Sequence, residues 1–227
     1  MVHTGGAMRR RMDHMRGWRA QLMRLTSDNL ACRRGGRMVF TGVSFAVAAG
    51  EALLVTGRNG AGKSTLLRLL AGLLPVAAGR VGWDGGAPDQ SVGEQAHYVG
   101  HLDALKPGLS VRDNLAFWTA WNGAQAEGID AALAALALDG LADLPAAYLS
   151  AGQRRRLALA RLVAVHRPIW LLDEPTAALD VTAQAALAQL MRDHLAGGGL
   201  IIAATHGPIG IDGARELRIG ATIGAAA

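Results

Sequence analysis

Residues 57–64 read G-R-N-G-A-G-K-S and directly follow the apolar run Leu53–Val55. This G-x-x-x-x-G-K-[ST] pattern is typical of a phosphate-binding loop, whose glycines let backbone N–H groups curl around phosphate oxygens. Such a loop has a buried strand before it and a helix after it, and we predict these at residues 52–56 and 65–74. The positive N-terminal end of that helix also favours an anion. The chain is therefore predicted to be an α/β protein with a nucleotide-binding loop.

The loop also indicates which groups hold the phosphates and the metal. Lys63 is expected to reach the outer phosphates, and the Ser64 hydroxyl is expected to ligate Mg²⁺, so the predicted cofactors are ATP and Mg²⁺. An ordinary strand-to-helix turn is the alternative in a chain with 30 glycines, but the apolar segments on both sides favour nucleotide binding. The predicted nucleotide-binding residues of this segment are Gly57, Arg58, Asn59, Gly60, Ala61, Gly62, Lys63, Ser64 and Thr65.

Positive charge is concentrated at the start of the chain. Residues 1–24 carry six arginines and one aspartate, whereas the other 203 residues carry 17 basic and 17 acidic side chains. This near-neutral remainder lacks the basic stripe that nucleic acid requires, so no nucleic-acid partner is predicted. The single cysteine, Cys32, allows no intrachain disulfide and favours a reducing cytoplasm. No apolar stretch reaches the roughly 18–20 residues of a spanning helix, and the basic start lacks the apolar core of a secretory signal.

Changes in composition divide the chain into three segments. We predict a basic disordered extension at residues 1–22, one folded domain at 23–220 and a tail at 221–227. The domain begins β-rich and contains a mostly helical insert at about 102–165, which separates two halves of an α/β sheet. Further buried strands are predicted at 169–172 and 200–204, with a helix at 183–195.

Three interpretations of the basic extension stay open. One is that translation begins at Met23 rather than Met1, since methionines recur before it. The arginines alternatively attract the segment weakly to an anionic lipid surface, or the segment is simply disordered.

Two adjacent carboxylates, Asp173 and Glu174, end the apolar run 169–172. Because ligands bind at the carboxyl ends of strands in such sheets, both side chains are expected in the nucleotide crevice. Asp173 is expected to hold Mg²⁺ or its waters, and Glu174 to accept a proton from the attacking water. A carboxylate that merely caps the next helix is the alternative.

The segment Leu149–Gln153 reads L-S-A-G-Q and is followed by R-R-R-L-A-L-A-R. It resembles the signature of ATP-binding-cassette (ABC) ATPases, usually written L-S-G-G-Q. The order of phosphate loop, helical insert, signature, D-E-P-T, A-L-D and T-H also resembles that family, from about residue 25 to residue 204. The resemblance implies a P-loop NTPase core with a mostly parallel sheet, an N-terminal antiparallel β subdomain and a helical subdomain.

The resemblance further implies an ATP hydrolase that works as a head-to-tail homodimer. Asp180 matches the loop that links the two sites, and His206 matches a switch histidine that contacts the γ-phosphate and orients the water with Glu174. The signature residues would contact the γ-phosphate held by the other copy, at the N-terminus of a helix. These trans residues are Ser150, Ala151, Gly152 and Gln153.

Three positions depart from the family pattern. Ala151 replaces the first signature glycine, which a methyl group allows if the φ angle stays negative. His101 stands where glutamine is usual, and a histidine can still hydrogen-bond a metal-bound water. Arg34 stands near the expected adenine-stacking aromatic, and a guanidinium can stack on a purine, with Arg33 or plain solvent exposure as alternatives.

These departures resemble one branch, the CcmA-type ATP-binding subunits of the cytochrome c maturation system. That branch implies a haem exporter or haem-chaperone release complex, with CcmB- and CcmC-like membrane permeases as partners that handle the haem. It also implies a peripheral position on the cytoplasmic face of the inner membrane, with the permease contact near residues 102–118. An ABC ATPase for another substrate, or one acting in cofactor assembly, is the alternative.

Overall fold

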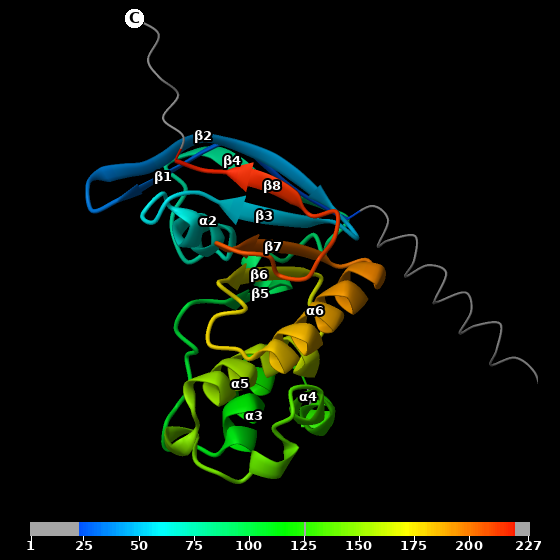
Figure 1. Cartoon of the computed structure of the whole chain (residues 1–227). Helices are drawn as coiled ribbons and strands as arrows, with labels where there is room; N and C mark the ends of the chain where they lie inside the picture. Colours follow the sequence, from blue (N-terminus) through cyan, green and yellow to red (C-terminus); the bar gives the residue numbers. More distant parts are fainter. Residues whose placement is uncertain (1–22, 125, 221–227) are drawn as a thin grey trace, which may run out of the picture.

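A computed structural model of the chain describes residues 23–124 and 126–220. The predictions for the extension 1–22 and the tail 221–227 lie outside these residues. The order of elements combines two sheets with a group of helices (Figure 1). The predicted α/β fold with a parallel sheet, an antiparallel sheet and helices is confirmed.

The antiparallel sheet has three strands in the order β2-β1-β4. These strands are β1 (Arg24–Arg34), β2 (Arg37–Ala48) and β4 (Ala78–Asp84). The second sheet is parallel, with five strands in the order β5-β6-β7-β3-β8. Its strands are β3 (Ala52–Thr56), β5 (Ala96–Val99), β6 (Ile169–Asp173), β7 (Leu200–Ala204) and β8 (Arg215–Arg218).

Helix α2 (Lys63–Leu70) lies between the two sheets, and its leucines pack into one core cluster with β1, β3, β6 and β7 (Figure 1). The opposite face of the parallel sheet is covered by α5 (Ala151–Ala164) and α6 (Val181–Ala196). The strand β6 serves both layers, because Ile169 packs on the α2 side and Trp170 on the α5 side. This alternation explains why the strand is apolar at every position.

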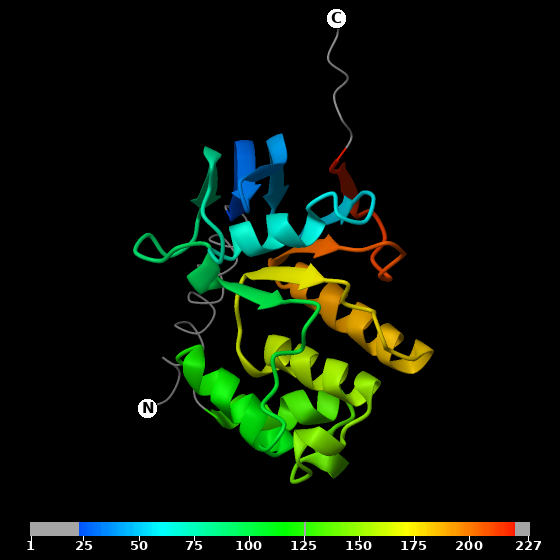
Figure 2. The ribbon, with the colours of Figure 1, turned by 90° about the vertical axis from the view of Figure 1, so that its left-hand side faces the viewer.

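The helices α3 (Val111–Trp121), α4 (Ile129–Ala135) and α5 form a group at one end of the molecule (Figure 2). Short 3-10 turns at Ala126–Gly128, Asp139–Leu141 and Ala146–Tyr148 connect them, and another, Gly93–Gln95, precedes β5. None of the helices in the described residues combines the length and the apolar character that crossing a bilayer requires.

Two details differ from the sequence prediction. The helix predicted at 65–74 ends at Leu70, because Gly72 donates to the Leu69 carbonyl and Leu73 donates to the Arg68 carbonyl. Such paired bonds close the last turn of a helix. The strand β8 was not predicted, because three of its four side chains are exposed and polar at the sheet edge.

Candidate functional site

A cavity of about 540 Å³ opens at the phosphate loop, beside the carboxyl ends of β3 and β6. Segments far apart in the sequence meet there, because parallel strands end at one edge of the sheet. Gly57, Arg58 and Ala61 belong to the loop without lining the cavity. Its lining residues are Arg34, Val39, Asn59, Gly60, Gly62, Lys63, Ser64, Thr65, His101, Asp173, Glu174 and His206.

Lys63 is the central cation of this cavity, and its side chain is mostly buried. Its Nζ donates to the carbonyl of Gly57 at 3.0 Å and lies 2.9 Å from His206 Nε2. The loop carbonyl therefore holds the Lys63 ammonium group near the N-terminus of helix α2. A cation with three donors at the N-terminus of a helix suits phosphate oxygens.

The backbone of the loop requires glycine at two positions. Gly57 has φ of 141°, and a Cβ there would lie 2.4 Å from the Ile219 carbonyl oxygen. Gly62 has φ of 103°, and a Cβ there would lie 2.8 Å from the side chain of Val39. Both contacts explain why glycine stands at these two positions of the turn that leads into Lys63.

Ser64 and Asp173 meet across the cavity floor. The Ser64 hydroxyl donates to Asp173 Oδ1 at 3.0 Å, although the residues are 109 positions apart. Asp173 is 2% exposed, and its Oδ2 is buried without a hydrogen-bond partner among the described residues. A buried carboxylate oxygen without a donor is costly. A hydroxyl and this carboxylate are hard oxygen ligands, so the pair fits Mg²⁺.

Glu174 adopts an unusual backbone conformation at the end of β6, with φ of 47°. Its N–H donates to the Ala204 carbonyl at 2.8 Å, which ties it to the end of β7. Its Oε1 lies 3.7 Å from His206 Nε2. Left-handed backbone at a residue other than glycine is sparsely populated and occurs at functional sites. The turn brings the Glu174 carboxylate and the His206 ring to the same side of the cavity.

The predicted signature residues lie at the start of α5 and, in the described part of the chain, do not line this cavity. Ser150 caps the helix by accepting from the Gln153 N–H at 3.2 Å, while Gln153 Oε1 accepts from the Ser150 N–H at 2.7 Å. This capping box leaves the N–H groups of Ala151 and Gly152 for an external acceptor. Ala151 is not among the described residues with positive φ, as its methyl group requires.

The other predicted residues fall into two groups. His101 and Arg34 line the cavity. Asp180 does not line it and instead caps α6 by accepting from the Ala183 N–H at 2.8 Å. The 178–180 turn nevertheless contacts the signature helix, because a Cβ on Gly152 would lie 2.9 Å from the Ala178 carbonyl oxygen.

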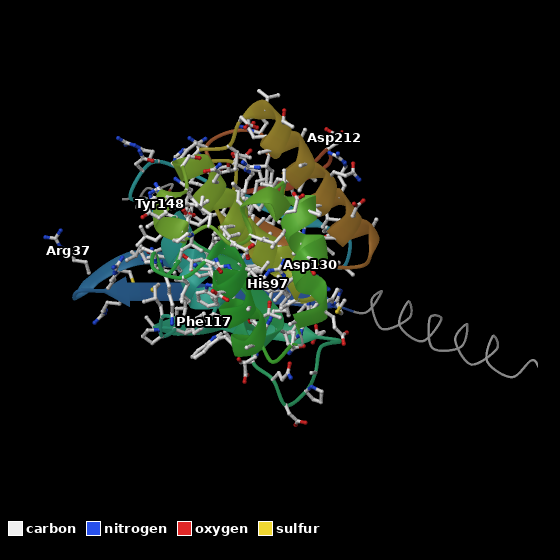
Figure 3. The ribbon with its side chains drawn as sticks, turned by 90° about the horizontal axis from the view of Figure 1, so that it is seen from below. Arg37, His97, Phe117, Asp130, Tyr148 and Asp212 are labelled. Atoms are coloured by element: carbon white, nitrogen blue, oxygen red, sulfur yellow. The ribbon has the colours of Figure 1, made fainter. Side chains whose placement is uncertain are left out.

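A second cavity, of about 550 Å³, was missed by the sequence analysis. It lies between the parallel sheet and α3 and is lined by Phe117, Trp118 and Trp121 of that helix. Figure 3 labels Phe117 among the helices seen from below. Three aromatics within five residues of the sequence are the signal that would have pointed to this face. We call this second cavity the aromatic groove.

Two arginines add positive charge to the aromatic groove. Arg161 lies over the Trp118 ring at 4.5 Å, and Arg68 donates to the Tyr98 hydroxyl at 3.2 Å. Burial and then the neighbouring Arg155 lower the pKa of Arg161 to about 10, so it stays charged at neutral pH. The described residues that line the groove include no aspartate or glutamate. The groove therefore combines apolar rings with a cationic wall.

Arg155 is also a residue that the sequence analysis overlooked. It is 3% exposed and donates to the main-chain carbonyls of Asp173 and Glu174, directly behind the cavity. Its helical spacing is the signal that would have identified it as buried. Arg155 lies on the same face of α5 as the buried residues Ala158, Leu159 and Leu162.

Comparison with known proteins identifies the family of this chain. Residues 40–177 match the family described as ABC transporter. The Cytochrome c biogenesis ATP-binding export protein CcmA of Rhodopseudomonas palustris (strain BisB5) is 63% identical over 199 residues, covering 88% of this chain and 99% of that protein. Its counterpart of the same name in Nitrobacter winogradskyi is 62% identical over 198 residues, covering 87% and 98%.

Two solved structures have a similar fold. One, an ATP-binding subunit of an ABC transporter, has a TM-score of 0.73 at 24% identity, over 80% of this chain and 79% of that chain. The other, a bacterial ABC exporter with ATP bound, has a TM-score of 0.75 at 27% identity, over 88% of this chain and 37% of that chain.

Proposed function

The chain belongs to the ABC transporter family as a CcmA-type ATP-hydrolysing subunit, and we propose that it powers the haem-handling complex of cytochrome c biogenesis. The observation that carries the site assignment is the meeting of Lys63, Asp173, Glu174 and His206 in one cavity. The assignment to cytochrome c biogenesis rests on the similarity to CcmA proteins over nearly their whole length.

Binding of ATP uses the phosphate loop. Lys63 and the N-terminal N–H groups of α2 neutralise the outer phosphates, while Thr65 lines the same cavity. Ser64 and Asp173 would hold Mg²⁺, which when bound neutralises charge on the phosphates. Arg34, at the rim beside Val39, provides a guanidinium for the adenine face.

Hydrolysis then requires a positioned water. Glu174 accepts its proton, and His206 donates a hydrogen bond that orients the γ-phosphate relative to Glu174. His101 lines the same cavity, and its imidazole would hydrogen-bond a water held there. Little covalent chemistry is asked of the protein, because phosphoryl transfer depends mainly on positioning and charge neutralisation.

The reaction is completed by a second copy of the chain. Ala151 and Gly152 lie at the start of α5 and do not line the cavity of their own chain, so their N–H groups are not used there. In a head-to-tail homodimer they donate to the γ-phosphate bound by the partner. Asp180, at the turn that contacts the signature helix, connects the two sites.

The membrane permeases, CcmB- and CcmC-like proteins, dock on the aromatic groove and handle the haem themselves. The groove opens next to residues 102–118, where the family resemblance places this contact. Trp121 is 75% exposed there, and large exposed aromatics are typical of interaction sites. Docking places the chain peripherally on the cytoplasmic face of the inner membrane.

The variant Glu174→Gln tests the hydrolytic assignment. It should bind ATP normally, form an ATP-stabilised dimer and turn over about 100- to 1000-fold more slowly, since a general base is lost. Single-turnover quench assays measure the rate, and sedimentation with ATP measures the dimer. Glu127→Gln, on an exposed turn, is the matched control. Rapid turnover by Glu174→Gln contradicts the assignment.

The pathway is tested in cells that lack the chromosomal copy. Wild-type chain should restore haem-stained c-type cytochromes, and Glu174→Gln should not. Normal c-type cytochromes without the chain would instead indicate another transported substrate or a role in cofactor assembly.

A further inference from the structure

The guanidinium of Arg155 donates hydrogen bonds to the main chain at the end of β6. Nη2 donates to the Asp173 carbonyl at 2.7 Å and to the Glu174 carbonyl at 2.8 Å, and Nε donates to the Pro175 carbonyl at 3.4 Å. Three successive carbonyls are thus held by one planar group from a different element, helix α5. A fork of fixed donors is the geometry that arginine provides and lysine does not.

The same guanidinium also holds the loop that follows β5. Nη1 donates to the Gly100 carbonyl at 2.7 Å and lies 3.3 Å from Asp103 Oδ1. Between these two residues stand His101 and Leu102, and both line the aromatic groove. The buried Arg155 side chain therefore connects two segments through hydrogen bonds: the loop that lines the aromatic groove and the main chain at Glu174.

Glu174 needs such a restraint because its φ of 47° is unfavourable for a residue with a side chain. Left-handed backbone of this kind is sparsely populated and persists where the surroundings impose it. The N–H of Glu174 is fixed by the Ala204 carbonyl, and its C=O accepts from Arg155 Nη2 at 2.8 Å and from the Ala177 N–H at 3.1 Å. Without Arg155, the carbonyl of the strained residue keeps only the longer bond, which comes from the turn that follows it and not from another element.

We propose that Arg155 is a positioning residue, which holds Glu174 in its left-handed conformation and links that conformation to the loop 100–103. This inference rests on the proposed role of Glu174 as the base. Arg155 does not line the nucleotide cavity, and it acts on the reaction through the backbone of Glu174. A shift of the loop at the aromatic groove would move the base through the same guanidinium.

The neighbouring Arg156 provides a matched control on the same helix. Its Nη1 donates to the carbonyls of Leu136 at 2.9 Å and Ala137 at 3.0 Å, both within the helical group. Replacing it removes an arginine with two carbonyl partners but leaves the end of β6 untouched.

The test compares Arg155→Met, Arg155→Lys and Arg156→Met in the full chain. For Arg155→Met we expect kcat to fall about 100-fold with KM for ATP changed less than about threefold, since positioning and not binding is lost. Amide hydrogen exchange should rise more than about tenfold at 100–104 and 174–179, while the centre of α5 stays protected. Arg155→Lys should recover part of kcat, and Arg156→Met should leave kcat and both segments as in wild type.

Several outcomes would overturn the proposal. A folded Arg155→Met that keeps kcat within about twofold does so, as does exchange that rises equally across β6 and α5. If Arg155→Met fails to fold, Arg155→Lys decides, and wild-type kcat with wild-type exchange at 174–179 refutes it. Failure of the base assignment is separate, because it shows as rapid turnover in Glu174→Gln whatever the exchange at 174–179 in the Arg155 variants.

Discussion

The proposed reaction site has two sides that are built in different ways. The sheet side consists of the cavity residues at the carboxyl ends of the parallel strands, and the helical side consists of the signature residues at the start of α5. On the sheet side, Lys63, Ser64, Asp173 and His206 contact groups within the chain and border one cavity. On the helical side, the start of α5 closes only its own capping box, and Gly152 borders no part of that cavity. The sheet side borders one cavity within a single chain, and under the proposed function the groups of the helical side serve a second copy.

The difference follows from topology. Parallel strands bring their carboxyl ends together at one edge, so the fold itself assembles the sheet side. The helical group is inserted between β5 and β6. Its aromatic side chains Trp121 and Tyr148 and the first signature residues are exposed to solvent. Nucleotide binding is therefore expected of a single chain, whereas turnover and membrane attachment are expected to require partners.

The largest expected effect comes from Gly152→Asp on the helical side. The new Cβ meets the Ala178 carbonyl oxygen, and the carboxylate repels a phosphate, so turnover should fall by about 100-fold or more. ATP binding to the single chain should be unchanged in equilibrium titration. Gly140→Asp places the same side chain in open space on the helical group and should leave turnover intact.

Mixing experiments sharpen this prediction. Gly152→Asp chains mixed with Lys63→Ala chains should regain turnover that neither has alone, because one composite site combines the two intact halves. A mixture as inactive as its components would show that the two sides act within one chain.

A smaller effect is expected on the stability of the sheet side as the pH falls. Burial is the main cause that lowers the pKa of His97, on β5, to about 3, and the pKa of His194 is lowered to about 4 in the same way. The unfolded chain binds these protons near pH 6.5 and the folded chain does not, so stability falls as the pH drops below about 6.5. Between pH 7.5 and 5, the free energy of unfolding should decrease by about 2 kcal/mol for each histidine.

Urea unfolding across this pH range measures the effect. His97→Gln keeps a donor for the Val165 carbonyl but does not titrate, so it should remove the His97 share of the pH dependence. An unchanged slope in this variant would mean that His97 is not the group responsible.

The smallest expected effect is that of Trp121→Ala on membrane attachment. The side chain is 75% exposed, so the free energy of unfolding should change by less than about 0.5 kcal/mol. Binding to permease-containing membranes should weaken about tenfold, as expected for an interface tryptophan. Tyr148→Ala removes another aromatic side chain, also 75% exposed, outside the aromatic groove and serves as the control in a flotation assay. Equal weakening by both variants would exclude the groove as the docking surface.

The sequence pattern was sufficient wherever the chemistry is local. Three short motifs could be recognised from the sequence: the phosphate loop, the carboxylates at the end of β6 and the signature turn. Their local structure follows from glycines, from apolar runs and from the helix cap Ser150. We could predict that these motifs lie at strand ends and helix starts, because the spacing of apolar residues and the capping residues are properties of neighbours along the chain. The early end of α2 and the polar edge strand β8 were not predicted, since turn bonds and sheet pairing decide them.

What the motifs specify is the set of groups that we propose to bind phosphate and metal, because those groups follow from residue type and spacing alone. What only the folded chain decided is how they are held. The Ser64–Asp173 bond and the grip of Arg155 on Glu174 join residues from separate elements. Such contacts depend on how helices pack against the sheet. Linear spacing can place a side chain on a buried face, but it does not say which partner that side chain meets across the core.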